Sequence, residues 1–71
     1  MDITIRTGKK IIAEVWEDHG EMHQLDVLSE DRYAEINQWC IDSLGYHART
    51  AYHIFEFKKQ ADLEWFLLRW H

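Results

Sequence analysis

The chain has 71 residues, a net charge of −5 and 46% hydrophobic residues, which indicates one folded domain over residues 1–71. Its 14% aromatic content argues against intrinsic disorder. The single cysteine, Cys40, cannot form an internal disulfide, which excludes a disulfide-stabilised secreted scaffold. Neither a membrane span nor a signal peptide is indicated by the pattern of apolar residues, so we expect a cytoplasmic protein.

Two glycines predict three strands in the first 28 residues. Gly8 suits a type II′ turn that places Ile5 opposite Ile12, and Gly20 suits a type I′ turn that places Ile12 opposite Val27. One face of the resulting antiparallel meander is largely apolar and consists of Ile3, Ile5, Ile12, Glu14, Trp16, His23, Leu25 and Val27. We therefore expect its aliphatic members, Ile5, Ile12, Leu25 and Val27, to be buried together.

Residues 9–19 also allow a second interpretation. Their apolar residues fit a helical stripe that Gly20 would close. Strands are favoured because the segment is rich in β-branched residues and because the two hairpin registers agree.

The remaining sequence predicts a helix, a strand and a second helix. Ser29 is a good N-cap for a helix over residues 30–44, and Gly45 suits the left-handed position that ends it. Residues 50–57 alternate as a strand does, and a helical stripe begins near Gln60, although residues 66–70 could instead be extended. The predicted fold is α+β: a three-stranded antiparallel meander, a helix, a fourth strand and a C-terminal helix (βββαβα), with both helices on one face of the sheet.

Acidic residues concentrate in the segment from Glu14 to Glu35, which holds eight acids and, as its one basic residue, Arg32. Such a field repels phosphate backbones, disfavours direct nucleic-acid binding and attracts a basic protein surface. The candidate partner-binding acids are Glu17, Asp18, Glu21, Glu30, Asp31 and Glu35. The alternative interpretation is a solvated face that keeps a small protein in solution.

Four tryptophans are many for a domain of this size. Trp39 and Trp65 lie off the main apolar stripes of their predicted helices, and surface aromatic residues are enriched at protein interfaces. We therefore add Trp39 and Trp65 to the partner-binding residues, and we expect a homo-oligomer, most simply a dimer, with these two residues nearest the contact.

The sequence predicts no catalytic residues, no metal site and no cofactor. The five histidines and Cys40 do not have the spacing of known metal motifs, and Cys40 lies on a predicted buried stripe, where a thiol behaves as a small hydrophobe. Glu14 stands out on the apolar face. It lies at the rim of that face or anchors a ligand pocket, and its possible partners are His23, His53 and Arg49.

Two motifs carry a resemblance to a known group of proteins. They are Trp39-Cys40 on a helix that ends at Gly45, and a C-terminal pattern that reads Phe57-x4-Asp62-x3-Phe66-x-Leu68-x-Trp70. Residues 33–70 thereby resemble small accessory proteins of tailed bacteriophages, although Leu63 stands where that group typically has alanine. The resemblance implies a phage origin, a small α+β fold and a place in the host cytoplasm, and it transfers no catalytic residue.

These observations predict a non-enzymatic accessory protein that binds or inhibits a host or phage protein through an acidic and aromatic surface. One alternative is a protein that binds or sequesters a small ligand such as a nucleotide, with Arg49 and aromatic side chains stacking on the base. A second is a mimic of nucleic-acid charge.

Overall fold

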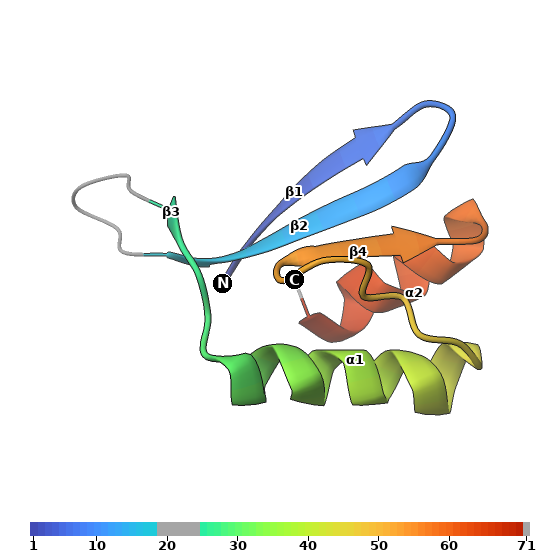
Figure 1. The fold of residues 1–71 in the computed structure, drawn as a ribbon. Helices are drawn as coiled ribbons and strands as arrows, with labels where there is room; N and C mark the ends of the chain where they lie inside the picture. The colour runs from blue at the N-terminus through green and yellow to red at the C-terminus, as the bar shows by residue number, and fades with distance from the viewer. Residues whose placement is uncertain (19–24, 71) are drawn as a thin grey trace.

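The computed structural model describes residues 1–18 and 25–70, and it places two helices against one face of a small antiparallel sheet (Figure 1). The elements in chain order are β1 (Asp2–Thr7), β2 (Ile11–Asp18), β3 (Leu25–Asp26), α1 (Glu30–Leu44), β4 (Ile54–Phe57) and α2 (Gln60–Trp70). Residues 11–18 are a strand and not a helix, α1 has its predicted bounds, and α2 stays helical through Trp70. The fold is α+β.

β2 is the central strand of the sheet. β1 and β4 both pair antiparallel with residues 11–14 of β2, so they occupy its two opposite edges, whereas β3 pairs only with Glu17 and Asp18. The strands that build the main sheet are therefore β1, β2 and β4, and in chain order this sheet reads ββαβα, with the helix after its second strand. The predicted βββαβα meander is wrong, because β4 takes the edge of β2 that the third strand was expected to occupy.

Burial explains why β4 takes that edge. The predicted second register placed Val27 opposite Ile12, but Glu56 of β4 lies there instead. β4 brings Phe55 and Phe57 into the core at 0% and 4% exposure, whereas Val27 is 45% exposed. Two buried aromatic rings stabilise this pairing far more than one valine could. The turn predicted at Gly20 lies outside the described residues.

The register of the first hairpin differs from the prediction by one residue. Arg6, and not Ile5, lies opposite Ile12, because three residues separate Thr7 from its partner Ile11. A shift of one residue turns every side chain of a strand to the other face. Ile12 therefore lies half-buried on the face away from the helices. Ile5 stays on the helix-facing side with Ala13, but it lies on the edge strand β1 and is 43% exposed.

The helix-facing side of the sheet and the two helices enclose the core. Fully or almost fully buried are Ala13, Val15, Leu28, Tyr33, Ile36, Cys40, Ala48, Phe55, Phe57, Leu63, Phe66 and Trp70. Both predicted caps of α1 are confirmed: Ser29 Oγ accepts the Arg32 N–H at 3.2 Å, and Gly45 has a φ of 88°. That φ lies in the left-handed region that glycine adopts without strain.

Candidate functional site

A polar cluster lies on the sheet face that the helices leave open. Glu14, at only 7% exposure, points to this face because its neighbours in the strand point to the core. One carboxylate oxygen forms an ion pair with Arg6, and the other lies 3.6 Å from His53 Nε2. The His53 ring packs against Trp16, with ring centroids 4.3 Å apart. A buried carboxylate is strongly disfavoured without such partners.

The positive charge of Arg6 and the His53 ring balance the charge of Glu14 in this cluster. Of the three predicted partners of Glu14, His53 is one, Arg49 lies elsewhere, and His23 is outside the described residues. The prediction missed Arg6 because the one-residue error in register placed it on the opposite face. His53 reaches Glu14 because it lies in the turn just before β4. This turn is closed by the Ile54 N–H, which donates to the Ala51 carbonyl at 3.3 Å.

Arg49 holds the start of α1 against the loop before β4. Its two terminal nitrogens donate to both carboxylate oxygens of Glu30 at 2.9 and 2.7 Å, and its Nε donates to the Tyr52 carbonyl at 3.0 Å. The guanidinium also lies over the rings of Tyr33 and Tyr52. The hydrogen bond from Arg49 holds the pKa of Glu30 below its usual value. Because these contacts engage the guanidinium, it is not free to stack on a nucleotide base.

The predicted acidic residues gather partly at one end of the molecule. Tyr33 of α1 donates its hydroxyl to the Val15 carbonyl of β2 at 2.7 Å, which places the first turns of α1 beside the end of β2. Burial raises the pKa of Tyr33, and the nearby Glu17 carboxylate adds to that rise. Glu17 and Asp31 are both exposed, and no ion pair is found for either within residues 1–18 and 25–70. These observations place Glu17 and the acids of the first α1 turn in one region, which we call the acidic end.

The other acidic candidates contribute less to this field. Arg49 pairs with Glu30, and Arg32 lies 3.4 Å from Glu35. Asp18 is the last residue of β2, and Glu21 lies outside the described residues.

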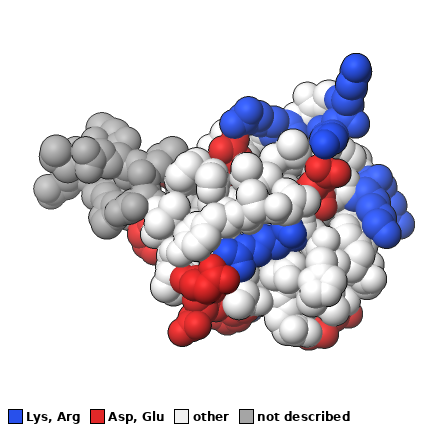
Figure 2. All heavy atoms as spheres, viewed as in Figure 1, with Lys and Arg blue, Asp and Glu red and all other residues white. Residues whose placement is uncertain are grey.

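Basic residues gather at the opposite end of β2. Lys9 and Lys10 precede the first residue of β2, and Lys58 and Lys59 follow Phe57, which is paired with that first residue. Lys10 also lies 3.8 Å from Glu56. Figure 2 shows the blue Lys and Arg atoms mainly toward the top and right of the view, with one blue band near its centre, and the largest red group at the lower left. Charge is therefore divided along the direction of β2.

The two predicted interface tryptophans belong to one aromatic cluster between the helices. Trp39 of α1 meets Trp65, Phe66 and Trp70 of α2 edge-on, with ring centroids 6.0 to 6.3 Å apart. Trp39 is half-buried, whereas Trp65 is 51% exposed. Much of the Trp39 ring is thus used to join the helices, and Trp65 presents the larger surface to solvent.

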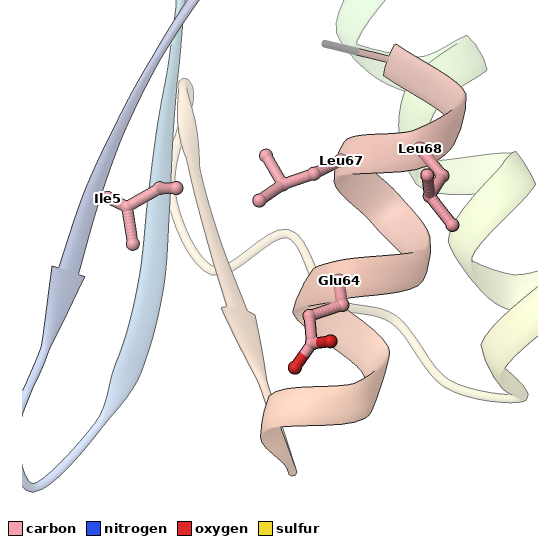
Figure 3. Close-up of a pocket in the computed structure, with 4 residues that line it drawn as sticks. All are labelled: Ile5, Glu64, Leu67 and Leu68. Atoms are coloured by element: carbon pink, nitrogen blue, oxygen red, sulfur yellow. The ribbon is translucent and has the colours of Figure 1, made fainter.

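An open groove of about 590 Å³ lies between β1 and α2. Ile5, Glu64, Leu67 and Leu68 line it, and in Figure 3 Leu67 points across the groove toward Ile5. Leu68 is 86% exposed. The prediction missed this groove because it counted Ile5 as a core residue.

Cys40 is fully buried, and burial raises the pKa of its thiol to about 12. A thiol in this state is a poor nucleophile because the thiolate is the reactive form. Within the described residues, no group of three or more His, Cys, Asp or Glu side chains could hold a metal ion. No helix in the described part of the chain is long and apolar enough to cross a membrane.

Comparison of the chain with protein-family models, with curated proteins and with solved structures finds no match. The resemblance of residues 33–70 to bacteriophage accessory proteins therefore stays a prediction. The function is inferred below from the surface of the chain itself.

Proposed function

We propose that this chain is a non-enzymatic binding protein whose acidic end engages a basic surface on another protein. The observation that carries the proposal is the division of charge along β2. Glu17 lies near the end of the strand that the first turns of α1 adjoin, Asp31 belongs to the first of those turns, and four lysines lie near the other end of the strand. An exposed patch of one sign attracts a surface of the opposite sign and speeds their encounter.

The residues considered above as candidates for catalysis or ligand binding, Cys40, Arg49 and Glu14, are buried or paired with other residues of the chain. Cys40 is buried with its pKa raised to about 12. Arg49 is held by Glu30 and two tyrosines, and Glu14 is held by Arg6 and His53. These engagements favour binding by contact over catalysis, and they favour a protein partner over a nucleotide. The resemblance to phage accessory proteins implies that the partner is a host or phage protein and that the site of action is the cytoplasm.

Affinity capture with charge-matched variants tests the proposal. The wild-type chain, Glu17→Lys and Asp42→Lys are immobilised and exposed to an extract of phage-infected cells, and the retained proteins are quantified by mass spectrometry. Both substitutions change the net charge equally, but Asp42 lies near the far end of α1. We expect a basic protein that the wild type and Asp42→Lys retain, that Glu17→Lys retains poorly and that salt elutes.

Two outcomes would contradict the proposal. One is equal retention by all three immobilised chains, because the acidic end would then have no special role. The other is release of a nucleotide as the bound species, because a small-ligand protein would then be the better interpretation.

A further inference from the structure

Among residues 1–18 and 25–70, no strand pairs with the outer edge of β1. The Val15 N–H donates to the His53 carbonyl at 2.9 Å on the β4 side of β2. Successive residues of a strand direct their N–H and C=O groups to opposite sides. Glu14, which precedes Val15, therefore directs its backbone groups toward β1, where it is paired with Thr4. Thr4 therefore directs its groups back to β2. The N–H and C=O groups of Ile3 and Ile5 point away from the sheet.

The opposite edge of the sheet is covered by the chain itself. The Glu56 N–H donates to the Ala48 carbonyl at 2.7 Å, and the Thr50 N–H donates to the Ile54 carbonyl at 2.9 Å. No comparable bond to the outer edge of β1 is found within residues 1–18 and 25–70. An open edge of this kind is a template for a further strand.

The sequence of β1 is complementary to itself in one antiparallel register. When two copies pair about Thr4, Asp2 of each copy lies opposite Arg6 of the other, and Ile3 lies opposite Ile5. Opposite charges and apolar side chains in directly opposed positions stabilise a sheet. The Arg6 side chain is 70% exposed despite its ion pair with Glu14, and a guanidinium has five N–H donors.

The groove beneath β1 adds an apolar surface on the same side. α2 packs against β2 and β4, which leaves Ile5 of β1 43% exposed above the groove. In the register about Thr4, Ile3 and Ile5 of both copies share the helix-facing side of the joined sheet. They would lie over Leu67 of α2, which is partly buried, and Leu68, which is exposed.

We propose that a second copy of this chain pairs antiparallel with the β1 edge about a two-fold axis at Thr4. The two sheets then form one continuous sheet, and Asp2–Arg6 ion pairs flank the axis. The contact centres on β1, and not on the Trp39 and Trp65 positions that the sequence indicated.

Engineered cysteines test this register directly. Thr4 faces its own copy in a pair without mutual hydrogen bonds, where Cα atoms are about 4.5 Å apart, a distance that a disulfide can span. Thr7 would lie six residues from its own copy, which is about 20 Å along a strand. With glutathione disulfide as the acceptor of two electrons, we expect Thr4→Cys to form a covalent dimer much faster than Thr7→Cys. The native Cys40 thiol is buried and contributes little.

The mass in solution gives an independent test. We expect light scattering to show twice the chain mass for the wild type at tens of micromolar. Ile5→Pro removes an outward N–H, and proline is tolerated on the open side of an edge strand. We expect it to weaken the dimer by about tenfold or more, with circular dichroism unchanged.

Asp2→Arg places like charges opposite each other and should also favour the monomer, which keeps the test valid if Ile5→Pro fails to fold. A monomeric wild type would overturn the proposal. Equal cross-linking of the two cysteine variants would overturn it too, as would a dimer that Trp65→Ala dissociates and Asp2→Arg does not.

Discussion

Tyr33 shows how a single side chain fixes the arrangement of the acidic end. Its hydroxyl donates to the Val15 carbonyl at 2.7 Å and accepts the Leu28 N–H at 3.1 Å, so it joins α1, β2 and the segment between them. Tyr46 has a similar role at the other end of the core. It donates to Asp62 at 2.8 Å and accepts the Lys58 N–H at 3.0 Å. Both hydroxyls satisfy polar groups that burial would otherwise leave unpaired.

Replacing Tyr33 by phenylalanine tests the first of these roles. The variant keeps the ring but leaves a buried carbonyl and a buried N–H without a partner, which costs about 1–3 kcal/mol. Urea unfolding should show this loss, whereas the matched substitution Tyr52→Phe, at an exposed ring, should change the unfolding midpoint little. Similar midpoints for the two variants would mean that the Tyr33 hydroxyl does not support the fold.

Alkaline pH tests the burial of Cys40 and Tyr46. Burial raises the pKa of Cys40 from 9.0 and that of Tyr46 from 10.0, each to about 12. Above pH 9 the unfolded chain releases protons that the folded chain retains, so stability is full below that pH and falls as pH rises toward 12. Urea midpoints against pH should fall in the wild type and fall less steeply in Cys40→Ala. Parallel curves for the two proteins would contradict a buried, protonated thiol.

At the scale of elements, the helices and the first antiparallel hairpin were predictable, but the register of the strands and the neighbour on the second edge of β2 were not. α1 begins after Ser29 and ends before Gly45 as predicted, because cap residues and a helical stripe are local signals. The sheet depends on the length of one loop and on competition between distant strands. The loop before Ile11 is one residue longer than predicted, so each side chain of β2 points to the face opposite the predicted one. β4, and not the predicted third strand, pairs with Ile12.

Adjacent residues of β2 provide a test of the observed register. Ala13 is fully buried among the helices, whereas Ile12 is half-buried on the open face. We expect Ala13→Asp to abolish cooperative folding, because it places an unpaired charge in the core. Ile12→Asp should still melt cooperatively, at a lower temperature. Thermal unfolding followed by circular dichroism decides the matter, and the reverse order of severity would restore the register predicted from the glycine turn.

At the scale of the whole molecule, sequence alone identified the acidic segment but not its geometry. The excess of acids before Glu35 was visible in the composition, yet the pairing of Glu30 with Arg49 depends on a tertiary contact. The groove and the open β1 edge depend on the hairpin register and could not be predicted once Ile5 was counted in the core. The alternation of Asp2, Thr4 and Arg6 was the available sequence signal for that edge.

The division of charge along β2 makes the central claim measurable as a rate. Screening shortens the reach of charges to about 8 Å at physiological salt, so electrostatic attraction should speed association most at low salt. The direct measurement is the association rate constant of the captured partner against salt concentration, for the wild type, Glu17→Lys and Asp42→Lys. The account predicts a slower rate and a shallower salt dependence for Glu17→Lys alone. Equal rates and equal salt slopes for all three proteins would show that the acidic end is only a solvated surface.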